Sequence, residues 1–140
     1  MKEAIQSSFN FEGYKILKSV FDRKEGELGK NFQINFVPSG IYSVKEKRFR
    51  INLGVIVVNE SKLLTIEIEA MAIFRLQGET APEILKNYFY LNAPAIFFPY
   101  IRAYISALTT LSGLTAVTLP TLNLSYLAEE LEKHTIRVED

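Results

Sequence analysis

The stretch Leu64-Thr65-Ile66-Glu67-Ile68-Glu69 alternates strictly between apolar and polar side chains, and the alternation continues to Phe74 or Leu76. A period of two residues is typical of a β-strand that has one face in a core and the other face in water. The stretch therefore predicts one strand of a sheet that is covered on a single face, as antiparallel sheets commonly are.

Similar patterns lie upstream of this strand. Phe32-Gln33-Ile34-Asn35-Phe36 alternates, and Phe49-Arg50-Ile51-Asn52-Leu53 alternates before the β-branched segment 55–58. A long mixed run over residues 9–23 comes first, and Pro38-Ser39-Gly40 predicts a turn after the second strand. Because short segments join the four predicted strands, an antiparallel sheet is favoured.

The second half of the chain carries helical patterns. A helix-start motif at residues 80–83 predicts a short helix, and Pro94 and Pro99 predict a break before a longer helix that stops at Gly113. A last helix is predicted from Ser125. Strands first and helices second predict an α+β fold, with a four-stranded antiparallel sheet and helices packed on one face.

Length and composition favour one soluble globular domain over residues 1–140, in which 48% of the residues are apolar. The 16 basic and 16 acidic side chains balance, which argues against a generic nucleic-acid binder, because such a protein needs excess positive charge. The chain has no cysteine, which excludes disulfides and a thiolate nucleophile. The first eight residues lack the apolar core of a signal peptide, so we expect a cytoplasmic protein.

The segment Ala103–Ala128 contains 26 consecutive residues without a charge. Its eight serines and threonines, together with Gly113 and Pro120, argue against a membrane span. A surface helix normally keeps a charged face toward water. The small residues of the long helix therefore predict a subunit interface, where a second helix can approach closely. They are Ala103, Ser106, Ala107 and Thr110.

Signals for catalysis are weak. His134, the only histidine, lies in a polar tail and is interpreted as a solvated helix-end residue. Glu67 and Glu69 share one strand face, which is interpreted as a hydrated surface rather than an acid–base pair. The basic cluster at residues 45–50 contains Phe49, but a solvated strand start explains it better than contact with single-stranded nucleic acid. We predict no catalytic residue, metal site or cofactor.

Three segments carry a family resemblance. Pro94-Ala95-Ile96-Phe97-Phe98-Pro99-Tyr100-Ile101-Arg102 resembles the signature segment of the SecB protein-export chaperones. Residues 67–74 resemble the last strand of that family, and residues 119–124 resemble its Phe-Pro-x-Leu-Asn-Leu segment. The segments occur in the family's order, and the resemblance covers roughly residues 9–131.

The resemblance implies a homotetramer, a dimer of dimers, in which long helices lie between eight-stranded sheets. It implies no catalysis, and a hydrophobic groove that holds unfolded preproteins or other non-native polypeptides. In the family an acidic sheet face contacts the translocase motor SecA. Here Glu67 matches one acidic position and Asp22 another, whereas Lys18 replaces a third. We expect Asp22, Glu67 and Glu69 to form a partly acidic partner surface.

The client groove is predicted at the second strand. Ile66, Ile68, Val55 and Val57 already supply the core, so the alternating apolar residues of the second strand are expected to line a groove with part of the helix layer. The predicted groove residues are Phe32, Ile34, Phe36, Ile41, Tyr42, Tyr100 and Tyr104.

Three functions remain open at this point. The leading hypothesis is an ATP-independent holdase chaperone that binds unfolded polypeptides before export through the Sec translocase, with SecA as a further partner. The alternative is a SecB-like chaperone dedicated to a toxin–antitoxin pair. A small-ligand binding protein or enzyme with an α+β fold is disfavoured, because it would need an enclosed pocket with converging polar groups.

Overall fold

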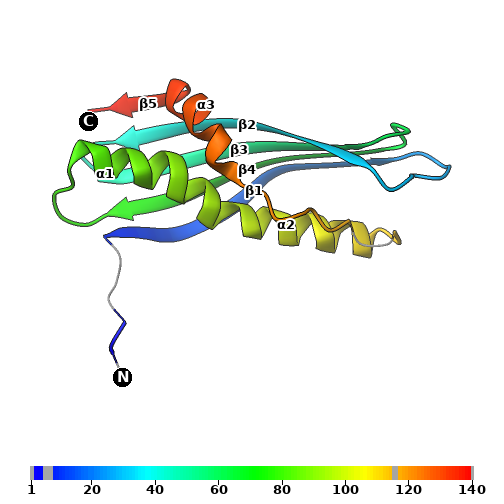
Figure 1. Cartoon of the computed structure of the whole chain (residues 1–140), viewed down its shortest axis with the longest axis horizontal. Helices are drawn as coiled ribbons and strands as arrows, with labels where there is room; N and C mark the ends of the chain where they lie inside the picture. Colours follow the sequence, from blue (N-terminus) through cyan, green and yellow to red (C-terminus); the bar gives the residue numbers. More distant parts are fainter. Residues whose placement is uncertain (1, 5–7, 115–116, 140) are drawn as a thin grey trace.

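The computed structural model describes residues 2–4, 8–114 and 117–139. These residues form a sheet with a layer of helices over one face (Figure 1), which confirms the predicted α+β class. The strands are β1 (Phe9–Arg23), β2 (Phe32–Ser43), β3 (Arg48–Asn59), β4 (Leu64–Leu76) and β5 (Thr135–Val138). The helices are α1 (Pro82–Asn87), the π-helical turn η1 (Tyr88–Asn92), α2 (Ala93–Leu111), the 3-10 turn η2 (Leu124–Leu127) and α3 (Ala128–Lys133).

The strand order in the sheet is β1-β4-β3-β2-β5. The first four strands pair antiparallel, as predicted, but β5 adds a fifth strand that runs parallel to β2 along Gly40–Ser43. The prediction of four strands was therefore one strand short. β5 has only four residues, which is too short for a two-residue period to be recognised in the sequence.

The core lies between the inner faces of β3 and β4 and the helix layer. Ile66 and Ile68 of β4 have no exposed surface, and neither have Val55 and Val57 of β3. Helix α2 contributes the largest apolar side chains from the other side, and all of them are buried. They are Phe97, Phe98, Ile101 and Ile105. The alternation of β4 therefore has the predicted cause, which is one buried face and one accessible face.

The sequence predicted a turn at Pro38-Ser39-Gly40. Strand β2 instead continues through Pro38 and Gly40 to Ser43. The backbone N–H of Gly40 donates to the carbonyl of His134, on the side of β2 away from β3. Because this direction alternates along an antiparallel strand, the N–H that Pro38 lacks would also have pointed away from β3. Proline is tolerated in that position, because no bond of the ladder to β3 is lost.

The helix layer is continuous where a break was predicted. Helix α1, the turn η1 and helix α2 follow one another from Pro82 to Leu111. Pro94 lies in the first turn of α2, where a missing N–H costs little, and the preceding π-helical turn adjusts the hydrogen-bond register. Only Pro99 lies inside the helix. Gly113 adopts φ 90°, a left-handed conformation that glycine takes readily, and it follows the helix end as predicted.

From Val117 on, the uncharged segment runs back along α2 toward α3, which Figure 1 shows in orange. This return along the helix explains much of the segment's lack of charge. Val117 and Leu119 are buried in this return. The backbone N–H of Val117 donates to the hydroxyl of the buried Thr109 at 2.8 Å, and that hydroxyl lies 3.0 Å from the carbonyl of Ile105. Of the described helices, none is long and apolar enough to cross a membrane.

Candidate functional site

Three successive inner-face side chains in the first half of β2 face the helix layer without being fully buried. We call Phe32, Ile34 and Phe36 the β2 row; all three are half-buried and pack against the core. The ring of Phe36 meets that of Phe98 edge to face, with 5.5 Å between centroids and 77° between planes. The β2 row is therefore an apolar surface that is supported by the core and still accessible from outside.

A hollow of about 780 Å³ opens beside Phe32. Its apolar lining comes from Leu28, before β2, and from Leu114 and Val117, after α2. Its rim also carries Arg23, Glu27 and Lys30. The hollow extends the β2 row toward the end of the molecule where the β1–β2 connection lies.

The sequence prediction missed Leu28, Leu114 and Val117. Leu28 was detectable, since it is the only large apolar residue within the charged segment 22–30. Leu114 and Val117 carried no such signal, because they lie in an uncharged segment whose path back along α2 is set by tertiary packing.

The backbone of β2 presents an open edge next to the row. Since the N–H of Gly40 points away from β3 toward His134, the alternation along β2 makes the N–H and C=O groups of Ile34 and Phe36 point the same way. In the described part of the chain, β5 alone pairs with this side of β2, and only along Gly40–Ser43. The edge over residues 32–39 therefore offers hydrogen-bonding groups directly beside apolar side chains.

Two predicted groove residues lie elsewhere, so the prediction that they share a groove with the β2 row was wrong. Ile41 points to the opposite face of the sheet, because β2 keeps its alternation through the expected turn. Tyr100 packs on Phe11 and Tyr14 of β1, with ring centroids 5.1 and 4.9 Å away. The strand order places β1 and β2 on opposite sides of β4 and β3.

The two other predicted tyrosines are only indirectly connected with the β2 row. Tyr42 shares the inner face of β2, but it lies at the β5 end of the strand, against the ring of Phe89 at 4.8 Å. Tyr104 is half-buried against the core, one helical turn beyond Tyr100. Their contribution to binding stays a prediction.

Comparison with models of known protein families assigns the chain to a family. The sequence model of the SecB family, described as preprotein translocase subunit SecB, matches residues 19–134, which is most of the chain. The protein belongs to the SecB family. Comparison with curated proteins finds no significant match.

The solved structures that match this SecB-family chain include the following two. One is the Mycobacterium tuberculosis SecB-like chaperone Rv1957 in complex with a ChAD peptide from the HigA1 antitoxin Rv1956. It matches with a TM-score of 0.68 and 19% identity over 82% of this chain and 91% of that chain. The other is a Streptococcus agalactiae protein of unknown function, with a TM-score of 0.43 and 16% identity over 81% of this chain and 97% of that chain. At this identity, the likeness to Rv1957 shows a shared fold.

The segment that resembles the SecB signature packs the first half of α2 onto the sheet. Within Pro94–Arg102, the side chains of Phe97, Phe98 and Ile101 are buried. Arg102 lies at the surface, 3.5 Å from the hydroxyl of Thr121 in the return segment. The buried residues of this segment therefore contribute to the core that supports the β2 row. The exposed Tyr100 of the same segment lies on the β1 side of the sheet.

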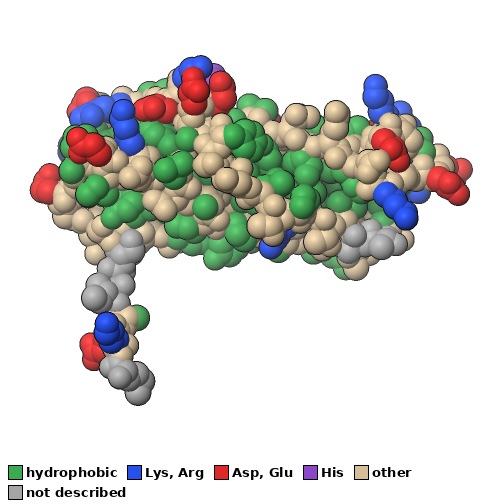
Figure 2. Space-filling view, in the orientation of Figure 1, with side chains coloured by type: hydrophobic (Ala, Val, Ile, Leu, Met, Phe, Trp, Pro, Cys, Tyr) green, Lys and Arg blue, Asp and Glu red, His purple; other side chains and the backbone are tan. Residues whose placement is uncertain are grey.

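The outer side of α2 carries the predicted small residues. We call Ala103, Ser106, Ala107 and Thr110 the α2 stripe; Ser106 is half-buried and the other three are exposed. The hydroxyl of Thr110 donates to the carbonyl of Ser106 at 2.9 Å and is thereby satisfied within the helix. Figure 2 shows a broad and mostly uncharged band over this layer, with a basic side chain in blue at its lower edge and other charged side chains gathered mainly toward the ends and the upper edge.

The three residues of the predicted partner surface share one face of the sheet, and their role in partner binding stays a prediction. Asp22, Glu67 and Glu69 lie on the outer face of the sheet, away from the helices. Lys18 shares this face, with its ammonium 3.6 Å from the Glu67 carboxylate. The face also contains a hollow of about 300 Å³. Its lining includes Leu17 and Val37, exposed by 55% and 62%, which the sequence prediction missed.

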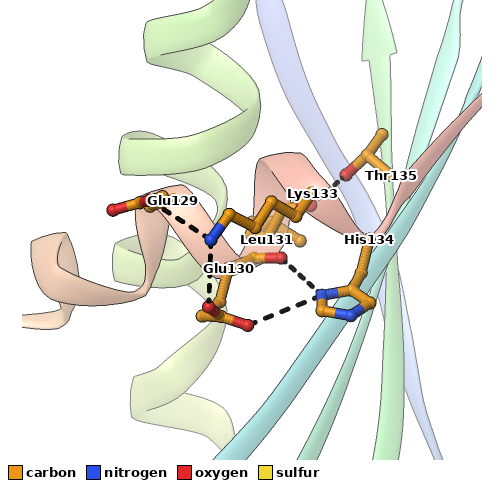
Figure 3. Close-up of polar contacts among 6 residues, drawn as sticks. All are labelled: Glu129, Glu130, Leu131, Lys133, His134 and Thr135. Carbon is orange, nitrogen blue, oxygen red and sulfur yellow. Dashed lines mark hydrogen bonds and ion pairs between the residues drawn. The ribbon is translucent and has the colours of Figure 1, made fainter.

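His134 ends α3 among exposed charged groups (Figure 3). Its Nδ1 lies 2.8 Å from the carbonyl oxygen of Glu130 and 3.7 Å from the carboxylate of the same residue. The neighbouring Lys133 bonds to Glu129, and this hydrogen bond raises the pKa of its ammonium. Across residues 2–4, 8–114 and 117–139, no group of three His, Cys, Asp or Glu side chains could hold a metal ion.

Phe49, weighed above as a stacking residue for single-stranded nucleic acid, has no exposed surface. Its ring stacks on Phe89 with 4.2 Å between centroids and 9° between planes. Arg48, next to it, points to the outer face and lies 3.6 Å from the carboxylate of Glu12. The basic cluster is therefore a solvated strand start, and it has no aromatic ring available for a base.

Proposed function

We propose that this SecB-family protein is an ATP-independent holdase chaperone that binds unfolded polypeptides along the β2 row and the hollow beside Phe32. The proposal rests on one observation, a half-buried aromatic and aliphatic row directly beside an open strand edge. Burial of apolar area gives affinity without demanding a particular sequence. Backbone hydrogen bonds at a strand edge are available to any extended chain.

Such a site distinguishes non-native chains from folded proteins. A folded protein has most of its large apolar side chains buried and most of its backbone groups paired, so it offers far fewer contacts of both kinds. The chemistry requires no catalytic group, cofactor or nucleotide. We place this activity in the cytoplasm, on clients that await export through the Sec translocase.

A toxin–antitoxin role is the second candidate. The outer sheet face, where SecB proteins are expected to meet SecA, is not uniformly acidic here, because Lys18 pairs with Glu67 and exposed Leu17 and Val37 lie beside Glu69. The SecB-like chaperone Rv1957, which has the same fold, was solved with an antitoxin peptide. Both features support a dedicated chaperone as an alternative to a general export factor, and purified SecA separates the two roles by binding or failing to bind this chain in low salt.

We further propose that the α2 stripe forms the helix-mediated interface of a homotetramer. Its exposed small residues let the α2 helices of two protomers approach closely. Ala107→Glu should then split the tetramer into dimers, because an unpaired carboxylate in the interface costs several kcal/mol. Light scattering measures the mass, and Glu83→Gln on α1 is the control at an exposed position. A monomeric wild type would contradict the proposal.

The holdase activity is tested by calorimetric titration with one polypeptide in two forms. A disulfide-containing protein is used either folded or reduced and carboxymethylated, which keeps it unfolded. We expect only the unfolded form to bind, with the same affinity in the presence and absence of ATP. Equal binding of the folded form, or a requirement for ATP, would rule out a holdase.

A further inference from the structure

Strand β5 covers only one end of the open edge described above. It pairs with Gly40, Ile41, Tyr42 and Ser43, whereas β2 begins at Phe32. The edge therefore consists of an occupied end and an unoccupied stretch on the same strand. Since both belong to one ladder of backbone groups, a polypeptide that pairs with the unoccupied stretch would meet β5 at Gly40.

The contacts of β5 are mainly backbone contacts. The N–H of Gly40 donates to the His134 carbonyl at 3.1 Å, and the N–H of Val44 donates to the Val138 carbonyl at 2.9 Å. By the pattern of a parallel pair, the N–H of Ile136 then faces Gly40. At the start of the strand, the Thr135 hydroxyl donates to the Leu131 carbonyl at 2.6 Å (Figure 3).

The side chains of β5 add little burial. Ile136 is 64% exposed and points to the outer face together with its neighbour Ile41, which is 37% exposed. The guanidinium of Arg137 lies over the ring of Tyr42, 5.9 Å from its centroid. No side chain of β5 is fully buried. A strand with so little apolar burial is attached weakly, because backbone bonds exchanged with water contribute modestly to stability.

We infer that the Gly40–Ser43 edge is a second strand-accepting site for clients, which β5 occupies within the chain and a client displaces. This inference rests on the holdase proposed above and concerns how its binding surface is regulated. The contacts of β5 identify the ligand class, which is an extended segment of β-branched residues with a basic side chain placed over Tyr42. Displacement of β5 lets one client pair with the whole of β2.

A reversible lock tests the inference in the full-length protein. Ile41 and Ile136 are direct partners in the parallel pair and both are exposed. Neighbouring strands bring such residues to a separation that a disulfide can span. The chain has no other cysteine, so the I41C/I136C variant forms a single bond between β2 and β5. Its oxidised form should bind the carboxymethylated client about tenfold more weakly than its reduced form, from the loss of a few backbone bonds.

A loosened variant tests the opposite direction. Ile136→Pro removes the N–H that faces Gly40, and Ile136→Ala is the matched control that keeps this N–H while removing the side chain. We expect Ile136→Pro to bind the client several-fold more tightly than Ile136→Ala. Tyr42→Leu in the same background should abolish any preference for client peptides with arginine over otherwise identical peptides with glutamate.

The outcomes separate this inference from the holdase itself. If the wild type does not bind the unfolded client, the holdase proposal fails. If the wild type binds but oxidised and reduced I41C/I136C bind equally, β5 is a permanent cover of the edge and the inference is overturned. Should Ile136→Pro fail to fold, the comparison of the oxidised and reduced lock still decides.

Discussion

Ile66 and Ile68 on β4, and Ile34 and Phe36 on β2, come from the same kind of alternating sequence, yet only the first pair is fully buried. β4 lies between two long strands, whereas β2 has a long strand on one side only and an open edge over residues 32–39. The place of a strand in the sheet therefore decides whether an apolar row becomes core or an accessible surface, even when the alternation is the same.

The largest expected difference between the Ile66–Ile68 pair of β4 and the β2 row is in their contribution to the stability of the fold. Ile68→Ala should lower the free energy of unfolding by about 2–5 kcal/mol, because it leaves a cavity in a fully packed site. Ile34→Ala should lower it by clearly less, because the half-buried side chain already contacts solvent. Urea denaturation measures both. Equal losses would show that the β2 row is part of the core and would remove the basis for a binding surface there.

The next difference is in client affinity. Replacing Ile34 and Phe36 by serine together should weaken binding of an unfolded client by about 2–3 kcal/mol, from roughly 100 Å² of lost apolar contact at about 25 cal/mol per Å². The mass of the oligomer should stay unchanged. Calorimetry and light scattering measure the two quantities.

The matched control for the double serine variant lies on the same strand. Gln33→Ser and Asn35→Ser change side chains that point to the outer face, so client affinity should be unchanged. If the control weakens binding as much as the β2-row variant does, the site is not on the inner face of β2.

The sequence predicted the elements that repeat a local pattern. β2, β3 and β4 were found from alternation, and α2 was found as a long helix with a small-residue stripe and no charge after Arg102. The shared outer face of Glu67 and Glu69 followed from their spacing alone. Local patterns were sufficient here because each of these features is decided within a few neighbouring residues.

The remaining features depend on strand order and tertiary packing, which no local pattern contains. In the sequence, Pro38 indicates a turn. Only the strand order shows that the N–H it lacks would point to the open edge of β2, where proline is tolerated. Tyr100 could be assigned to the β1 side only after β1 and β2 were placed apart in the sheet. β5 was missed because four residues show no period, although they cover part of the candidate site.

The orientation of the backbone groups on β2 can be tested by a pair of proline variants. Asn35→Pro removes an N–H that faces β3 and should lower the free energy of unfolding by about 1–2 kcal/mol through the lost bond. Ile34→Pro removes an N–H at the open edge, as Pro38 already does, so it should unfold at higher urea than Asn35→Pro. If the order is reversed, the edge described for residues 32–39 is incorrect.

The smallest expected effect on stability is at the outer face, and it separates that face from the β2 row. The ammonium of Lys18 and the carboxylate of Glu67 lie 3.6 Å apart with side chains exposed by 50% and 38%. Such a surface pair contributes at most about 1 kcal/mol, so Glu67→Lys should hardly change the unfolding midpoint. Client affinity should also stay constant, because the substitution lies on the face opposite to the β2 row.

Binding of purified SecA in low salt should weaken in Glu67→Lys. Lys18→Glu should strengthen SecA binding by making the same face more acidic. A loss of client affinity in Glu67→Lys would show that the two faces are coupled. If SecA does not bind the wild type at all, the outer face serves another partner, and the toxin–antitoxin role becomes the stronger candidate.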